Sequence, residues 1–201
     1  MFFKTRVEHE NLRSKIREFA EEEVKPIAFT LDKENEFPTE AIKKLAKMGM
    51  MGIPYAKEYG GAGLDVISYA IAVEELSRVD GGTGVILSAH TSLGAYPIAA
   101  YGTEEQKQKY LIPLAKGEKL GAFGLTEENA GSDAGGTETT AVLEGDHYIL
   151  NGSKIFITNA GKADIYIIFA VTTPDIGTRG ISAFIVEKGW EGFSFGQHYD
   201  K

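Results

Sequence analysis

The chain has 201 residues, of which 43% are hydrophobic and 10% aromatic, so it can bury a core in one large domain or in two small ones. Its formal net charge of −8 at pH 7 argues against binding to nucleic acids or to anionic membrane surfaces. It contains no cysteine, which excludes disulfides and thiolate metal ligands, and its four histidines are too far apart in sequence to form a compact metal site.

Residues 1–120 carry the periodicity of helices. Apolar residues recur every three or four positions from Leu12 to Leu31, which places them on one buried helical face. Start and stop signals delimit further helices at residues 38–49, 64–82, 83–102 and 103–118. The second of these is expected to stop at Gly81-Gly82, the third is apolar on nearly all sides, and the fourth begins with a Thr103 cap. We therefore predict an all-α domain over residues 1–120.

After residue 120 the pattern changes to short β runs. Alternation at Ala141 and Leu143, turn residues at 144–146 and a second run from Tyr148 predict a hairpin. The segments "ADIYIIFAVTT" and "GISAFIVEKG" are rich in β-branched and aromatic residues, which favour strands. Residues 121–201 are therefore predicted to form a β-domain, either a sheet or a barrel. No low-complexity linker separates the two parts, so we expect them to pack together.

The segment "FGLTEENAGSDAGGTETT", residues 123–140, is rich in glycine and hydroxyl groups and has no lysine or arginine. It lacks the signatures of the P-loop and of the dinucleotide-binding fold. Its glycines would still allow backbone N–H groups to converge on an anion. Taken alone, an ordinary polar loop capped by Asp133 is the simpler interpretation.

Four motifs together resemble the acyl-CoA dehydrogenases in wording, order and spacing: "YGGAGLD", "SLGAYPIAAYGTEEQKQKYL", "LTEENAGSD" and "NGSKIFITNAG". The resemblance runs nearly end to end and implies a multi-domain α+β protein. It identifies residues 1–120 with the N-terminal helical domain and residues 121–201 with an incomplete, β-barrel-like middle domain. It also implies that the chain is truncated, as a fragment, a shortened gene model or part of a split protein, because the C-terminal helical bundle of the family is absent.

The family resemblance implies FAD as cofactor and an acyl-CoA thioester as substrate. In such enzymes a carboxylate removes the α-proton while the β-hydrogen leaves as hydride to flavin N5. The wording of "FGLTEENAGSD" and "SKIFITN" is similar to that of butyryl-CoA dehydrogenases, which implies a short-chain substrate. An electron-transfer flavoprotein is the implied electron acceptor, and the full-length protein is expected to be a homotetramer in the cytoplasm, without a membrane span.

The resemblance assigns cofactor-binding positions to nine residues: Phe123, Gly124, Leu125, Thr126, Gly131, Ser132, Phe156, Ile157 and Thr158. The first four match a strand end beside the flavin, and "IFIT" matches a strand behind it, with the Thr158 hydroxyl at N5. Gly131 and Ser132 match a phosphate-proximal turn in which Gly131 is expected to need a positive φ. Ser132 is also expected to bind the pantetheine part of CoA. Many relatives carry tryptophan in place of Phe156.

Each assignment has a structural alternative. Phe123 and Phe156 are typical core aromatics of a β-domain, and Thr126 and Thr158 are typical strand threonines. The alternatives for the whole protein are a non-catalytic binding module of the same fold and an oxygen-using relative such as an acyl-CoA oxidase or a flavin monooxygenase.

Three further titratable residues lie near these motifs. Glu127 and Glu128 are interpreted as solvated acids at a loop edge, and His90 as either adjacent to the acyl pocket or a hydrogen-bonded structural histidine. No residue matches the catalytic glutamate of the family, so no catalytic residue is predicted in this chain. No metal ligand is predicted either, because cysteine is absent and the histidines are scattered.

Overall fold

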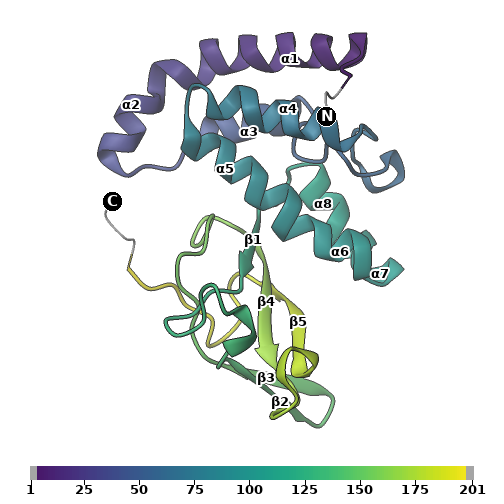
Figure 1. Ribbon diagram of the computed structural model, residues 1–201, viewed down its shortest axis with the longest axis vertical. Helices are drawn as coiled ribbons and strands as arrows, with labels where there is room; N and C mark the ends of the chain where they lie inside the picture. Colours follow the sequence, from purple (N-terminus) through teal and green to yellow (C-terminus); the bar gives the residue numbers. More distant parts are fainter. Residues whose placement is uncertain (1–3, 198–201) are drawn as a thin grey trace.

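The computed structural model describes residues 4–197, and the ends of the two predicted domains, residues 1–3 and 198–201, lie outside this range. Helices form one layer of the molecule and a β-sheet forms the other (Figure 1). The last helix ends at Ala115 and the first strand begins at Gly121. The predicted domain boundary at residue 120 stays a prediction, because side chains from both layers share one hydrophobic cluster.

The chain begins with three consecutive helical elements: α1 (Val7–Phe19), the π-helical η1 (Ala20–Val24) and α2 (Lys25–Glu34). The predicted apolar face is buried as far as Val24, with Ile16 and Ala20 fully inaccessible. The prediction is wrong for α2, which has no buried residue and exposes Ile27. In Figure 1, α2 extends past the other helices of the described chain, in keeping with its exposed apolar side chains.

The remaining helices lie beneath α1: α3 (Thr39–Lys47), η2 (Lys57–Tyr59), α4 (Val66–Ser77), α5 (Gly81–Ser88), η3 (Ala89–Ala95), α6 (Tyr96–Tyr101), α7 (Glu104–Gln106), η4 (Lys107–Leu111) and α8 (Ile112–Ala115). The predicted stop at Gly81-Gly82 is wrong, because Gly81 opens α5. The Asp80 carboxylate accepts hydrogen bonds from the backbone N–H groups of Gly82 and Thr83, so it caps a new helix there. The predicted Thr103 cap is confirmed by its bond from the Gln106 N–H.

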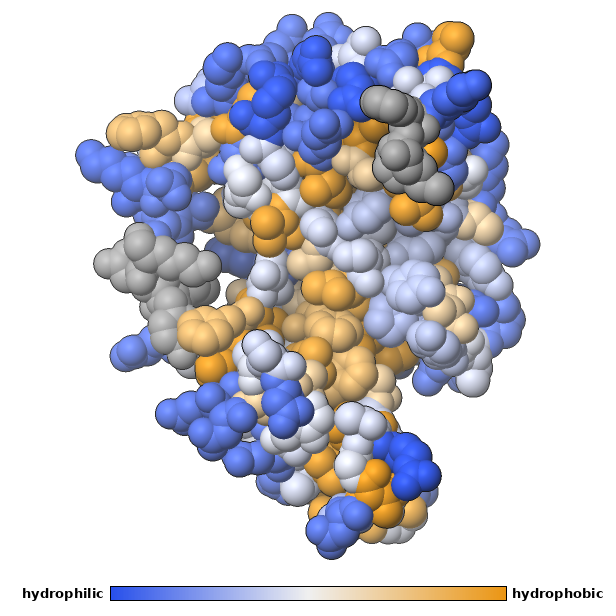
Figure 2. Space-filling model, viewed as in Figure 1, coloured by the Kyte–Doolittle hydropathy of each residue, from blue (hydrophilic) through white to orange (hydrophobic). Residues whose placement is uncertain are grey.

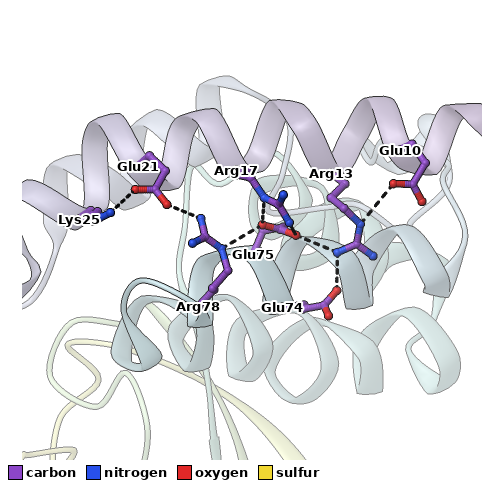
Figure 3. A network of polar contacts seen from close by, with 8 residues as sticks. All are labelled: Glu10, Arg13, Arg17, Glu21, Lys25, Glu74, Glu75 and Arg78. Carbon is purple, nitrogen blue, oxygen red and sulfur yellow. Dashed lines mark hydrogen bonds and ion pairs between the residues drawn. The ribbon is translucent and has the colours of Figure 1, made fainter.

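A buried carboxylate fastens α1 to α4. Glu75 on α4 is 1% exposed and accepts hydrogen bonds from Arg13, Arg17 and Arg78. Figure 3 shows how these arginines converge on Glu75, with further acidic partners towards both ends of the network. The apolar core of the helical layer includes Leu45.

The strands form one mixed sheet from β1 (Gly121–Gly124), β2 (Thr140–Glu144), β3 (His147–Asn151), β4 (Ile165–Val171) and β5 (Ile181–Glu187), with short 3-10 turns at η5 (Ala134–Gly136) and η6 (Gly177–Gly180). The central strand β4 pairs antiparallel with β5 along its whole length. Its other edge pairs in parallel with β1 and, at Val171, with β2. The predicted hairpin is confirmed as β2–β3, with Ala141 opposite Leu150.

Two predictions about the β-domain differ from the structure. Within residues 4–197 the sheet is open, so closure into a barrel is not confirmed. The "IFIT" segment is irregular rather than a strand, and both Phe156 (φ 56°) and Asn159 (φ 69°) have left-handed backbone conformations. A strand cannot continue through such residues, because the positive φ turns the chain out of the extended direction.

Candidate functional site

A pocket of about 220 Å³ lies where η3, β1 and the segment 156–158 meet. Its lining consists of Ala89, Leu93, Phe123, Leu125, Thr126, Phe156, Ile157 and Thr158. Six of the nine predicted cofactor-binding residues are therefore brought together, from segments about thirty positions apart in sequence. Figure 2 shows apolar side chains gathered in this part of the surface, between the helical layer and the sheet.

Strand β1 places its end at the pocket because β4 holds it in register. Phe123 pairs with Ile167 in the sheet, and its ring lies 5.0 Å from that of Phe169, centroid to centroid. Gly124 is buried and does not line the pocket. A Cβ atom at Gly124 would lie 2.6 Å from Cδ1 of Ile168, so a larger residue at this position would require the end of that side chain to move.

Phe156 lies at the surface of the pocket. Its side chain is 66% exposed, so the alternative of a core aromatic is wrong for this residue. Its left-handed backbone and that of Asn159 bracket Ile157 and Thr158. The lining of a larger groove of about 1580 Å³ also includes Phe156, Ile157 and Thr158, and this groove extends to residues 35–37, 39 and 190–197. The segment 156–158 therefore contributes to the lining of both hollows.

Glu127 is not a solvated acid, and this prediction is wrong. The residue is 5% exposed, and its carboxylate forms an ion pair with Lys154, which is 7% exposed. The carboxylate also accepts hydrogen bonds from the backbone N–H groups of Glu138 (2.6 Å) and Thr139 (3.1 Å). Glu128 is exposed, as predicted.

This ion pair is part of a set of contacts that holds the loop carrying Leu125 and Thr126 of the pocket lining. Lys154 Nζ donates a second hydrogen bond to the carbonyl of Leu125, at 3.1 Å, and the Ile155 N–H donates to the carbonyl of Thr126, at 2.9 Å. Burial raises the pKa of Glu127, but the hydrogen bond from Lys154 and those from the backbone outweigh it and lower the pKa to about 2. Glu127 is thus ionised at neutral pH and holds the loop that carries Leu125 and Thr126.

The turn at Gly131 and Ser132 lies outside the pocket. Both residues are exposed and neither belongs to the lining. Gly131 does not have a positive φ, and a Cβ atom there would meet no atom within 4 Å, so the expected backbone requirement for glycine is wrong. Binding of phosphate by Gly131 and of pantetheine by Ser132 stays a prediction.

His90 is fully buried and does not belong to the pocket lining, which includes its neighbour Ala89 and Leu93 from η3. Of its two interpretations, the hydrogen-bonded structural histidine is confirmed: its ring nitrogens lie 3.1 Å from the Leu114 carbonyl oxygen and 3.0 Å from the Gly121 nitrogen. Sequence reasoning missed Ala89 and Leu93. Their helix is apolar on nearly all sides, so its periodicity did not distinguish the pocket face from the core faces.

The side chains that line the pocket are apolar apart from the hydroxyls of Thr126 and Thr158, and none from the described part of the chain is titratable. No cluster of three or more histidine, aspartate or glutamate side chains suited to a metal ion occurs among residues 4–197. In the same range, no helix combines the length and apolar character that crossing a membrane requires.

Comparison with known proteins identifies two family domains. Residues 6–118 match the acyl-CoA dehydrogenase N-terminal domain, and residues 122–201 match the acyl-CoA dehydrogenase middle domain. A curated relative, the short-chain-specific acyl-CoA dehydrogenase of Clostridium acetobutylicum, is 66% identical over 197 residues, which are 98% of this chain and 52% of that protein.

Solved structures agree with the sequence match. A chain from work on the electron transferring flavoprotein of Acidaminococcus fermentans is 54% identical with a TM-score of 0.96, covering 100% of this chain and 53% of that one. An acyl-CoA dehydrogenase of Bacillus anthracis complexed with FAD is 39% identical with a TM-score of 0.90, covering 98% of this chain and 34% of that one. This chain spans about half the length of the curated relatives it matches. From the two domain matches and these relatives, the chain belongs to the acyl-CoA dehydrogenase family.

Proposed function

We propose that this chain is the N-terminal and middle part of a FAD-dependent dehydrogenase that oxidises a short-chain acyl-CoA between its α and β carbons. The observation that carries the proposal is the pocket between η3, β1 and the segment 156–158, which six residues at matched flavin-binding positions line. The C. acetobutylicum relative, which is named for short-chain substrates, supports the substrate class. The B. anthracis structure, which contains FAD, supports the cofactor.

The described residues fit a flavin ring. Phe123, Leu125 and Ile157 give the pocket apolar walls, which suit a planar aromatic ring, and the exposed ring of Phe156 offers it a stacking face. The hydroxyls of Thr126 and Thr158 supply hydrogen bonds to its polar edge. We assign these two threonines to orienting the ring, and the Glu127–Lys154 ion pair to fixing the loop that carries Thr126.

Bound FAD would supply the redox chemistry by accepting a hydride from the β carbon of the substrate. The α-proton needs a separate acceptor, and within residues 4–197 no carboxylate lines the pocket. We therefore assign this chain to binding and orientation, and place the proton acceptor in a part of the protein outside this sequence. The A. fermentans structure supports an electron-transfer flavoprotein as the partner that removes the electrons. A homotetrameric assembly remains part of the proposal.

The test uses the full-length protein that contains this sequence. We expect it to purify with bound FAD, to lose its yellow colour when butyryl-CoA is added without oxygen, and to regain it when an electron-transfer flavoprotein is added. A preparation that is colourless and takes up no FAD would contradict the cofactor assignment.

Other outcomes would favour the two alternatives. A flavoprotein that no acyl-CoA reduces would indicate a non-catalytic binding module of this fold. A reduced flavin that reacts with oxygen faster than with the electron-transfer flavoprotein would indicate an oxygen-using relative. A comparison of butyryl-CoA with octanoyl-CoA tests the substrate class, and faster reduction by octanoyl-CoA would contradict it.

A further inference from the structure

The three walls of the pocket meet at the backbone of one residue outside its lining, Gly121. Strand β1 starts at Gly121, and within the described residues its only partner strand is β4, on one edge. The N–H and C=O groups of one strand residue point to the same side, so the Gly121 groups that face away from β4 need partners elsewhere. Both groups find buried side chains, those of His90 and Asn159.

His90 connects Gly121 to the helical layer. Its Nδ1 atom accepts the Gly121 N–H at 3.0 Å, so the ring proton must be on Nε2, which donates to the Leu114 carbonyl at 3.1 Å. This neutral tautomer satisfies both ring nitrogens of a side chain that is 0% exposed. The neighbouring residues Ala89 and Leu93 of η3 line the pocket, so the histidine fixes β1 against the helix that forms the opposite wall.

Asn159 connects Gly121 to the third wall. Its Nδ2 group donates to the Gly121 carbonyl at 3.0 Å and to the Ile86 carbonyl at 3.3 Å, at the end of α5. The residue is 7% exposed and has a φ of 69°, a conformation that asparagine tolerates better than most residues. Because Asn159 directly follows Thr158, the two hydrogen bonds set the position of the pocket hydroxyl relative to β1.

Glycine at positions 94 and 121 allows the backbones of η3 and β1 to approach each other closely. A Cβ atom on Gly94 of η3 would lie 2.8 Å from the Cα and carbonyl carbon of Gly121, closer than side-chain atoms pack. The backbones of η3 and β1 are therefore in direct contact beside His90. The π-helical element η3 supplies Ala89 and Leu93 to the pocket lining.

We propose that His90 and Asn159 are positioning residues of the flavin pocket, which act together by holding the N–H and C=O of Gly121 and so set the spacing of all three pocket walls. The proposal rests on the proposed flavin function of the pocket. Neither side chain belongs to the pocket lining, which includes Phe123 and Thr158. Loss of the hydrogen bond from either His90 or Asn159 to Gly121 is expected to change the affinity for the flavin and the absorption spectrum of the bound flavin, and not only the stability of the fold.

Two substitutions at His90 separate its two hydrogen bonds. The carboxamide of asparagine reaches about as far as Nδ1, and that of glutamine about as far as Nε2. His90→Asn therefore keeps an acceptor for the Gly121 N–H, and His90→Gln keeps a donor for the Leu114 carbonyl. In the full-length protein we expect His90→Gln to raise the dissociation constant for FAD by roughly tenfold, since a buried N–H loses its partner, and His90→Asn to change it much less.

Asn159→Gly tests the hydrogen bond from Asn159 to the Gly121 carbonyl. Glycine adopts a positive φ freely, so this substitution keeps the backbone conformation and removes the side chain with its amide group. We expect weaker FAD binding and a shifted flavin absorption band. Glu75→Gln is the control, because it removes a buried, hydrogen-bonded carboxylate from the helical layer without any contact to the pocket. It should lower the melting temperature and leave the FAD dissociation constant and spectrum unchanged.

The outcomes distinguish this inference from the proposed function. His90→Gln and Asn159→Gly variants that fold, lose thermal stability and bind FAD with wild-type affinity and spectrum would overturn the positioning role. If the wild-type protein takes up no FAD, the proposed function fails. Hydrogen exchange of the Gly121 amide then tests whether His90 holds the Gly121 N–H in a hydrogen bond. That amide should exchange faster in His90→Gln than in His90→Asn. Equal exchange rates would overturn the role of His90 in holding the Gly121 N–H as well.

Discussion

At the scale of single residues, Glu127 shows how a buried charge organises a binding loop. Its carboxylate joins the segment 125–127 to Lys154 and to the backbone of residues 138–139. Desolvation of two charges is expensive, and here the partner charge and the backbone N–H groups offset it. Loss of one partner leaves the other charge buried and unpaired.

We predict that Lys154→Met lowers the free energy of unfolding at pH 7 by about 3 kcal/mol, because it leaves the Glu127 carboxylate without its counter-charge. Urea denaturation measures the change. Lys162→Met is the matched control, since Lys162 is an exposed lysine of the same region and should change little. The double variant Glu127→Gln with Lys154→Met should recover part of the loss, and a single variant as stable as the wild type would contradict the role of the pair.

The same pair makes stability depend on pH. The pKa of Glu127 is about 2 in the folded chain, below the usual value of about 4.3, so the ionised carboxylate stabilises the fold above pH ~4.3. This contribution is lost as the pH falls from about 4.3 towards 2. Unfolding free energies of the wild type and of the Glu127→Gln variant should therefore converge over this range, and a constant difference between them would argue against the low pKa.

Thr158 is the residue-scale test of the proposed chemistry. We predict that Thr158→Ala keeps FAD bound but slows its reduction by acyl-CoA by about tenfold to a thousandfold, as expected when one preorganised hydrogen bond is lost. Stopped-flow reduction of the full-length protein measures the rate. Thr158→Ser retains the hydroxyl and is expected to retain most of the rate. Unchanged reduction in the alanine variant would remove Thr158 from the flavin site.

At the scale of elements, the packing of α1 on α4 depends on the Glu75 network. Hydrogen bonds from Arg17 lower the pKa of Glu75 to about 2, against the effect of burial, which raises it. Its partners come from both helices, two from α1 and one directly after α4, so the carboxylate neutralises a group of arginines that would otherwise repel one another (Figure 3).

We predict that Glu75→Gln lowers the free energy of unfolding by about 2 kcal/mol, less than for a fully buried pair because the arginines are partly exposed. Chemical denaturation at neutral pH measures this loss. Glu74→Gln is the comparison, since Glu74 is a more exposed acid of the same network, and its loss should cost under 1 kcal/mol. Equal losses for the two variants would show that the burial of Glu75 contributes nothing.

At the scale of the whole molecule, apolar side chains remain exposed around the pocket. Among the residues that line the pocket, Leu93 is 40% exposed and Phe156 66%. Exposed apolar side chains gathered at one pocket favour association with other protein surfaces.

We predict that a protein consisting only of residues 1–201 binds FAD weakly, has no acyl-CoA dehydrogenase activity and self-associates. The pocket has walls on the described residues but no carboxylate to accept a proton, and its apolar rim stays accessible. Size-exclusion chromatography and a dye-reduction assay with butyryl-CoA and added FAD measure these properties. A soluble monomer that reduces the dye would place the proton acceptor within these residues.

The sequence alone predicted what depends on neighbours within a few positions. The helical face up to Val24, the Thr103 cap and the β2–β3 hairpin follow from local spacing and local hydrogen bonds, and all are present. The family motifs also predicted most of the residues that line the pocket.

Only the tertiary structure decided the features that depend on contacts between distant segments. Glu127 is buried because Lys154 and the backbone of residues 138–139 fold onto it, which its acidic local sequence did not indicate. The segment after Ile155 has the residue types of a strand, yet it turns where Asn159 binds Gly121 and Ile86. Local propensity favoured an extended chain there, whereas hydrogen bonds to a strand and a helix, both distant in sequence, hold a left-handed turn in place.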